Sequence, residues 1–151
     1  MTAELIIRPI RGQDRDQWQA LWRAYLAFYN TDVGADVYEA SFTRYAEPDF
    51  MDMRGWMAWD GEAALGLVHS IAHLHGWKAE PTTYLQDLFT TPAARGKGVA
   101  RALIDTVYAD ADAQGRPSVY WLTQTGNATA RALYDKIALP TDFMIYRRKL
   151  D

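Results

Sequence analysis

The change in hydrophobic period around Pro92 constrains the fold of this chain more than any other feature of its sequence. Residues 83–90, which precede it, are rich in Thr, Tyr, Leu and Phe, as strands are. Beyond it, apolar residues recur at every third or fourth position and predict a helix over residues 97–114, which Gly115 ends. A strand that leads into a long amphipathic helix requires a layered fold in which helices pack on a sheet.

The same patterns predict the remaining elements. Asp60-Gly61 separates two apolar runs and predicts a hairpin, because this dipeptide supplies the positive φ of a tight turn. This order of elements predicts one α+β (mixed α/β) domain over residues 1–151, with antiparallel strands first and one β-α-β crossover near its C-terminal half. We expect strands at residues 5–7, 56–59, 64–74, 83–90, 118–123 and 143–148, and helices at residues 14–30, 37–45, 97–114 and 127–137.

The composition excludes several classes of protein. A chain of 151 residues with 49% hydrophobic and 23% charged residues is typical of a single globular domain. The absence of cysteine excludes disulfides, thiolate-held metal centres and a cysteine nucleophile, and it fits a reducing compartment. The net charge is −3 and the basic residues are scattered, which disfavours binding to duplex nucleic acid. With no long apolar run and no signal pattern, we expect a soluble, cytoplasmic protein with no membrane partner.

The loop before the helix at residues 97–114 has the features of an anion-binding site. Gly96 and Gly98 have no side chain to keep a pyrophosphate from the backbone. Arg95 and Lys97 add positive charge to a helix N-terminus, which already favours anions. The alternative is an ordinary glycine-containing helix start with solvated basic residues. The spacing matches neither the P-loop nor the dinucleotide-binding fingerprint.

This loop resembles motif A of the Gcn5-related N-acetyltransferases, the GNAT family, whose signature is Arg/Gln-x-x-Gly-x-Gly/Ala. Arg95, Gly98 and Ala100 occupy its three defined positions. One strand and one helix later, residues 127–134 (Asn-Ala-Thr-Ala-Arg-Ala-Leu-Tyr) resemble the family's second signature, Asn-x-x-Ala-x-x-Leu-Tyr. The resemblance covers nearly the whole chain and is greatest to the Hpa2-like and diamine-acetyltransferase-like branch.

The resemblance implies the GNAT fold, a twisted, mostly antiparallel sheet with a parallel pair at the cofactor cleft and helices on both faces. It implies acetyl-CoA as cosubstrate, no metal, and direct acetyl transfer in a ternary complex to a primary amine of a small molecule. A polyamine, an amino acid or a related amine would serve as acceptor. Members of this branch are frequently homodimers, so we expect a homodimer. The implied cofactor-binding residues are Leu88, Phe89, Thr90, Arg95, Gly96, Lys97, Gly98, Val99, Ala100, Arg101, Asn127 and Ala130.

Tyr134 and Asp87 are the candidate catalytic residues. The resemblance makes Tyr134 the general acid, and a phenol, with a pKa of about 10, is well matched to protonating a thiolate. The alternative for Tyr134 is packing on its helix face. Asp87 lies in an otherwise apolar strand, where a carboxylate is a base, an anchor for the substrate ammonium, or a structural acceptor. Because Gln86 stands where some diamine acetyltransferases have a glutamate, the base stays open between Asp87, a histidine and ordered water.

The aromatic residues have two expected roles. Trp18, Trp22, Tyr25 and Tyr29 recur at helical spacing and are expected to pack the helix at residues 14–30 on the sheet. Some aromatic faces could also receive a cationic amine. The candidate substrate-binding residues are Tyr25, Tyr29, His73, Trp77 and Gln86, with Phe28 and Tyr38 as further wall residues.

Two polar clusters have alternative interpretations. His69, His73 and His75 have the even spacing of one strand face, and three imidazoles could hold zinc. Since residues of one strand extend rather than converge, and no acidic partner lies in that segment, we expect no metal there. The other cluster, which would either attract a cationic substrate or form solvated surface, is Asp32, Asp36 and Glu39.

Two other functions are compatible with the same motifs. A protein-lysine or N-terminal acetyltransferase would keep the chemistry and change the acceptor. A degenerate domain would bind acyl-CoA without catalysis. Asn127 and Tyr134 argue against the second alternative, because a module that only holds CoA has no need of an acid at the thioester.

Overall fold

The computed structural model describes residues 4–48, 50 and 52–150 and contains one five-stranded sheet. The strands lie in the order β1-β2-β3-β4-β5, and each of the first four is antiparallel to its neighbours among them. β5 is parallel to β4, so the predicted sheet with its parallel pair is confirmed. The strands are β1 (Leu5–Pro9), β2 (Met53–Asp60), β3 (Ala63–His73), β4 (Thr82–Thr90) and β5 (Val119–Tyr120), and the α-helices are α1 (Arg15–Phe28), α2 (Ala35–Ala46), α3 (Val99–Ala113) and α4 (Ala128–Ile137).

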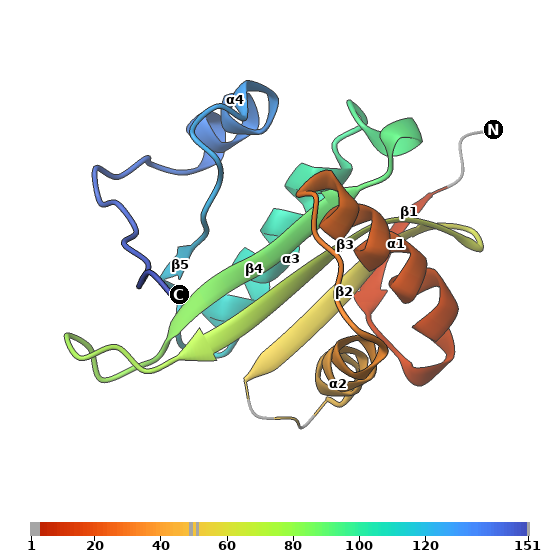
Figure 1. The fold of residues 1–151 in the computed structure, drawn as a ribbon, viewed down its shortest axis with the longest axis horizontal. Helices are drawn as coiled ribbons and strands as arrows, with labels where there is room; N and C mark the ends of the chain where they lie inside the picture. Colours follow the sequence, from red (N-terminus) through yellow and green to blue (C-terminus); the bar gives the residue numbers. More distant parts are fainter. Residues whose placement is uncertain (1–3, 49, 51, 151) are drawn as a thin grey trace. The chain divides into compact units, whose positions relative to one another are not determined.

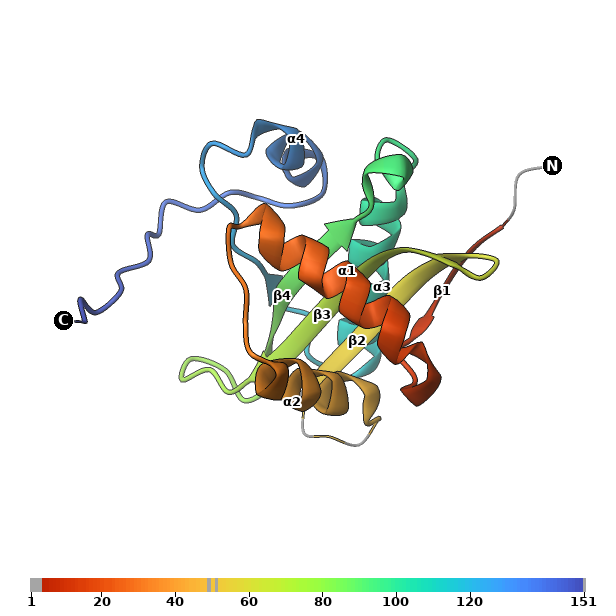
Figure 2. The same cartoon turned by 45° about the vertical axis from the view of Figure 1, so that its right-hand side comes forward.

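The chain divides into two compact units, the first ending at Trp121 and the second beginning at Leu122. The first unit holds the whole sheet, with α1 and α2 on one face and α3 on the other (Figure 1, Figure 2). This arrangement confirms the expected helices on both faces. Within the described residues, no helix is both long enough and apolar enough to cross a membrane.

One core cluster lies between the sheet and the helices α1 and α2, and buried apolar residues of α3 pack on the other face of the sheet. Trp18, Leu21 and Trp22 form the buried stripe of α1, and the rings of Trp18 and Trp22 stack with centroids 5.1 Å apart. Tyr38 and Phe42 of α2 join the same cluster. The predicted packing role of the two tryptophans is therefore confirmed.

Glycines with positive φ occur at two of the positions where the sequence predicts a turn or a helix end. Gly61, with φ +59°, lies in the turn of the β2–β3 hairpin, as the Asp-Gly pair predicts. Gly115, with φ +71°, follows the C-cap of α3 and ends that helix.

β4 is irregular on both of its edges. His69 of β3 pairs with Asp87, whereas Ser70 pairs with Leu85, so Gln86 is an extra residue that makes a β-bulge. On the other edge β4 pairs with β5 only at Thr83 and Tyr84. Beyond Tyr84, this edge of β4 has no strand partner among the described residues.

The second unit contains α4 and a C-terminal segment without regular structure. The strand predicted at residues 143–148 is wrong, because these described residues form no strand. A strand exists only where a neighbour completes its hydrogen bonds, and this segment has no such neighbour in the described chain. Its large apolar side chains are exposed, among them Phe143, Met144, Ile145 and Tyr146.

Candidate functional site

The turn from β4 into α3 is shaped by glycines. A short 3-10 helix, η2 (Pro92–Ala94), follows β4, and α3 begins at Val99. Gly96 and Gly98 have φ of +77° and +79°, and Gly98 is the N-cap of α3. This backbone conformation favours glycine, and a Cβ built at either position would meet no atom within 4 Å. The loop is therefore open to a ligand from the side where these side chains would lie.

The charges at this loop suit an anion. Arg95 and Lys97 are exposed, and neither has an ion pair within the part of the chain that the structure describes. Arg101, one turn into α3, lies 3.8 Å from Asp105. The N–H groups of the first helical turn have no intrahelical acceptor, and Gly98 at the N-cap has no side chain that could accept from them. Backbone donors, helix dipole and basic side chains therefore occur together where a diphosphate could bind.

The strand leading to the loop offers backbone groups. Leu88, Phe89 and Thr90 lie on the part of β4 that β5 does not pair with. The Phe89 side chain is buried in the core and its ring lies 6.4 Å from that of Tyr25, so it is the backbone of this residue that remains for a ligand. An extended ligand arm can add to such an edge as a further strand would.

Asp87 lies within a buried hydrogen-bond network. Trp22 Nε1 donates to its Oδ2 at 3.3 Å, and His69 Nδ1 lies 2.8 Å from the same oxygen. Trp18 Nε1 donates to the other ring nitrogen of His69, Nε2, at 2.9 Å. The Tyr45 ring stacks on His69 with centroids 3.8 Å apart. The carboxylate is thus well satisfied, and sequence reasoning missed its histidine partner because His69 lies on the neighbouring strand, not in the same segment.

Tyrosines surround this carboxylate. Burial raises the pKa of Tyr25, and the charge of Asp87 and a side-chain hydrogen bond to it raise that pKa further. Burial and the charge of Asp87 also raise the pKa of Tyr29 and of Tyr45, and burial, Tyr120 and Asp87 raise that of Tyr84. These phenols stay protonated, and so the site combines one carboxylate with neutral aromatic rings. That combination suits a cationic amine.

The remaining predicted acceptor residues have other surroundings. His73 Nε2 lies 2.8 Å from the hydroxyl of Tyr120, at the end of β3. Trp77 is 91% exposed in the loop between β3 and β4 and makes an edge contact with His75. Gln86 is exposed at the bulge of β4. The structure therefore brings Tyr25 and Tyr29 to Asp87, whereas His73 lies with Tyr120 and Trp77 lies with His75.

The histidines have separate partners. His69 is buried against Asp87, whereas His73 is exposed at the end of β3 and His75 is half-buried beyond it. Among the described residues, no group of three or more His, Cys, Asp or Glu side chains is arranged to hold a metal ion.

The second signature forms a capped helix in the second unit. The Asn127 side chain is the N-cap of α4 and accepts a hydrogen bond from the Ala130 N–H at 3.4 Å. Arg131 Nη1 donates to the Thr125 carbonyl at 2.7 Å and ties α4 to the preceding loop. Tyr134 is half-buried on the same helix.

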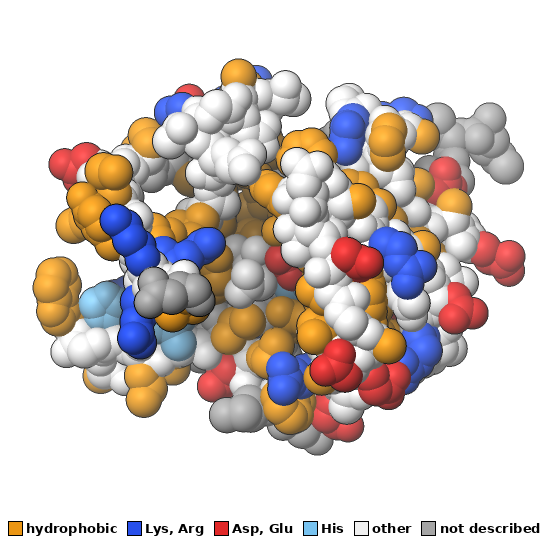
Figure 3. Space-filling view, in the orientation of Figure 1, with side chains coloured by type: hydrophobic (Ala, Val, Ile, Leu, Met, Phe, Trp, Pro, Cys, Tyr) orange, Lys and Arg blue, Asp and Glu red, His pale blue; other side chains and the backbone are white. Residues whose placement is uncertain are grey.

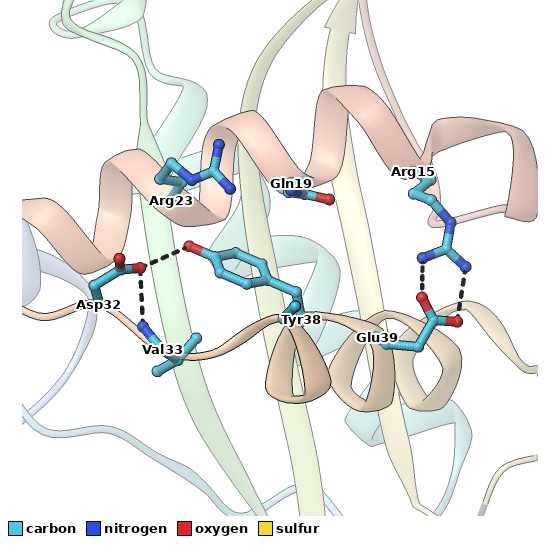
Figure 4. A pocket seen from close by; sticks show the side chains of 8 residues that line it. Arg15, Gln19, Arg23, Asp32, Val33, Tyr38 and Glu39 are labelled. Carbon is cyan, nitrogen blue, oxygen red and sulfur yellow. Dashed lines mark hydrogen bonds and ion pairs between the residues drawn. The ribbon is translucent and has the colours of Figure 1, made fainter.

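A separate polar pocket of about 300 Å³ lies between α1 and α2 (Figure 4). Glu39 accepts hydrogen bonds from both terminal nitrogens of Arg15, and Asp32 accepts one from the Tyr38 hydroxyl at 3.3 Å. Both acidic and basic side chains occur on this part of the surface (Figure 3). Of the acidic residues that follow α1, Asp32 and Glu39 thus already accept hydrogen bonds from other side chains. The lining residues are Arg15, Gln19, Arg23, Asp32, Val33, Ala35, Tyr38 and Glu39.

Solved acetyltransferase structures share this fold. The aminoglycoside N-acetyltransferase AAC(6')-Iy, solved with a bisubstrate analogue, aligns with a TM-score of 0.84 and 19% identity, over 99% of this chain and 100% of that one. A ribosomal-protein-alanine N-acetyltransferase from Brucella melitensis biovar Abortus 2308 aligns with a TM-score of 0.79 and 16% identity, over 97% and 99%.

Sequence comparison identifies the family. The acetyltransferase (GNAT) family model matches residues 16–138. The D-amino-acid N-acetyltransferase HPA3 of Saccharomyces cerevisiae is 38% identical over 146 residues, which are 95% of this chain and 90% of that protein. This match supports the resemblance to the Hpa2-like branch. The chain therefore belongs to the acetyltransferase (GNAT) family and is an N-acetyltransferase.

Proposed function

We propose that residues 1–151 form one catalytic domain that transfers the acetyl group of acetyl-CoA to a primary amine of a small molecule. The observation that carries the proposal is that one strand, β4, presents both halves of the site. The edge of β4 that has no strand partner beyond Tyr84 in the described residues runs into the glycine loop, and Asp87 lies in the same strand among tyrosines. Two substrates that bind along one strand would meet directly, so no acetylated enzyme is required.

The cofactor half of this proposal is supported by the loop. The backbone of Leu88, Phe89 and Thr90 would pair with the pantetheine arm, and the segment from Arg95 to Arg101 would hold the pyrophosphate. For Asn127 and Ala130 of α4, the support is their match to the family's second signature. AAC(6')-Iy, whose fold this chain shares, has been solved in complex with CoA.

The acceptor half is supported by Asp87 and its surroundings. The carboxylate would bind the substrate ammonium, and the Tyr25 and Tyr29 rings would contact its carbon atoms. Amino acids are the first acceptors to test, because HPA3 carries the name of a D-amino-acid N-acetyltransferase. Polyamines and aminosugars follow, since several proteins of the same fold are aminoglycoside acetyltransferases.

In the proposed reaction, the ammonium loses one proton and the free amine attacks the thioester carbonyl. The C–N bond forms, the C–S bond breaks, and the thiolate takes a proton from Tyr134. The nitrogen loses a second proton as the amide forms. One of the two protons restores the Tyr134 hydroxyl, so the reaction releases one proton overall. The protons that leave the nitrogen pass to Asp87, to ordered water or to a histidine. His69 is unsuited to this role, because its ring is fully buried and both nitrogens are bonded, to Trp18 and to Asp87.

The test is a thiol-release screen with acetyl-CoA. Amino acids of both hands, polyamines, aminosugars and short peptides are offered as acceptors, and free CoA is measured. We expect release that depends on one class of small amine. Release with peptides alone would assign the chain to protein acetylation. Tight acetyl-CoA binding with no release for any class would make it a binding module.

We also propose a cytoplasmic homodimer. The absence of cysteine fits a reducing compartment. The exposed apolar residues of the segment 143–146 support association, because a second copy could cover them. Light scattering across a range of concentrations should give a mass near 34 kDa, twice the 17.2 kDa of one chain. A constant mass of one chain would contradict the dimer.

A further inference from the structure

The His69 ring is held on every side within the first unit. It is fully buried, the Tyr45 ring stacks on it within 8° of parallel, and each of its nitrogens has a polar partner. An imidazole this enclosed has one position and one set of hydrogen bonds. Its partners therefore decide which nitrogen carries the proton.

Trp18 fixes the tautomer of His69. An indole N–H can only donate, so Nε2 of His69, at 2.9 Å, must accept and carries no hydrogen. The hydrogen of the neutral ring is then on Nδ1, which donates to Asp87 Oδ2 at 2.8 Å. A hydrogen on Nε2 would set two N–H groups against each other, so the Trp18 contact disfavours the Nε2–H tautomer.

This chain of hydrogen bonds orients the carboxylate. Oδ2 of Asp87 accepts from His69 and also from Trp22 Nε1, at 3.3 Å. Because the two donors come from β3 and α1 and meet at one oxygen, they restrict rotation of the carboxylate.

We propose that His69, held as the Nδ1–H tautomer by Trp18, is a positioning residue that orients Asp87 toward the amine of the acceptor. His69 does not touch the substrate, and its effect passes through Asp87. The inference rests on the proposed function, in which Asp87 binds the acceptor.

The first test needs no substrate. Two-bond ¹⁵N–¹H correlations of histidine-labelled protein distinguish the tautomers, and we expect His69 to carry its proton on Nδ1. The Trp18→Phe variant removes the indole donor together with part of the ring volume, a loss of volume that the control Trp59→Phe shares, so the Nδ1–H tautomer should lose its exclusive population. An Nε2–H tautomer or an imidazolium at His69 in the unaltered protein would overturn the inference, whatever the activity.

The second test separates acceptor from cofactor. Trp18→Phe should raise KM for the amine found in the screen about tenfold, the equivalent of about 1.4 kcal/mol, and leave KM for acetyl-CoA within about twofold. Trp59→Phe is the matched control. Trp59 is buried in the same core cluster, and its indole nitrogen has no hydrogen-bond partner in the described residues. This control should change neither constant.

Substitutions at His69 add a rescue experiment. His69→Asn keeps an amide donor near the position of Nδ1, whereas His69→Leu keeps none. We expect the amine KM of His69→Asn to lie closer to that of the unaltered protein than the KM of His69→Leu. Equal KM values for the two variants would mean that His69 serves packing alone.

The Asp87→Asn variant distinguishes a failure of the proposed function from a failure of the inference about His69. If this variant binds the amine normally, the proposed role of Asp87 is wrong and the inference falls with it. If Asp87→Asn raises the amine KM but Trp18→Phe and His69→Leu do not, the proposed function stands and the inference about His69 fails.

Discussion

His69 of β3 lies opposite Asp87 of β4, and 2.8 Å separates His69 Nδ1 from Asp87 Oδ2, although the two residues are 18 positions apart in sequence. Their pairing depends on the bulge at Gln86, which sets the register of the two strands at this point. The bulge therefore determines that His69 is the residue opposite Asp87, which is proposed to bind the amine of the acceptor.

Replacing Gly98 by valine should weaken cofactor binding. The side chain would occupy the space through which the pyrophosphate reaches the backbone, and Kd for acetyl-CoA should rise about tenfold or more. Gly115→Val is the matched control, since Gly115 has a similar φ of +71° at the other end of α3. Calorimetric titration should find normal affinity in Gly115→Val. Normal affinity in a folded Gly98→Val protein would contradict the loop's role.

Tyr134→Phe should lower kcat by about 10²–10⁴, the usual effect of losing a general acid. The ring and its packing on α4 are kept, so the free energy of unfolding and the affinity for acetyl-CoA should change little. Steady-state kinetics with titration of the cofactor checks both. If turnover is unchanged, the thiolate takes its proton elsewhere. If affinity collapses instead, the hydroxyl holds the thioester rather than protonating it.

Asp14→Asn should destabilise the protein by about 1–3 kcal/mol, because three charge-assisted hydrogen bonds are lost or weakened. Asp14 accepts from both terminal nitrogens of Arg8, at 2.7 and 2.9 Å, and from the Arg11 N–H at 2.9 Å. Burial alone would raise the pKa of Asp14, but the bonds from Arg8 and Arg11 outweigh it and hold the pKa below its usual value. Asp16→Asn, on the exposed start of α1, is the control.

Because the pKa of Asp14 is lowered in the folded protein, the stability that Asp14 contributes depends on pH. A carboxyl with a lowered pKa in the folded state stabilises the protein fully above its unfolded pKa of about 4, and this stabilisation is lost as the pH falls. Urea unfolding at neutral pH and at about pH 3 should therefore show a smaller difference for Asp14→Asn than for the unaltered protein. Equal differences in the two proteins would contradict this account.

Tyr25 and Tyr45 should limit stability at alkaline pH. Burial, and then the charge of Asp87, raise the pKa of both phenols in the folded protein. A group with a raised pKa contributes its stability below the unfolded value of about 10, and this contribution is lost as the pH rises above it. Unfolding titrations from about pH 8 to pH 11 should show a smaller loss of stability in Tyr25→Phe and Tyr45→Phe. Parallel curves would refute the prediction.

The elements with strong local signals could be predicted from the sequence. The stripe containing Trp18 and Trp22 predicted α1, Asp60-Gly61 predicted the β2–β3 turn, and Gly115 predicted the end of α3. Each depends on neighbouring residues, because helix periodicity and turn conformation are local properties.

Features that depend on distant neighbours could not be predicted in this way. Residues 143–148 have the composition of a strand but no strand beside them in the described chain, and β5 is shorter than its apolar run. The bond between His69 and Asp87 needs the register of β3 and β4, which one extra residue shifts. No pattern within either strand contains that information.

The bulge at Gln86 places an unusual requirement on β4. Because side chains alternate along a strand, deleting this one residue would shift the pairing of every residue on one side of it, Asp87 included. Replacing the exposed Gln86 by another residue leaves the number of residues in β4, and so its register with β3, unchanged. Folding thus requires that a residue be present at position 86 but does not require that it be glutamine, so this position tolerates substitution but not deletion.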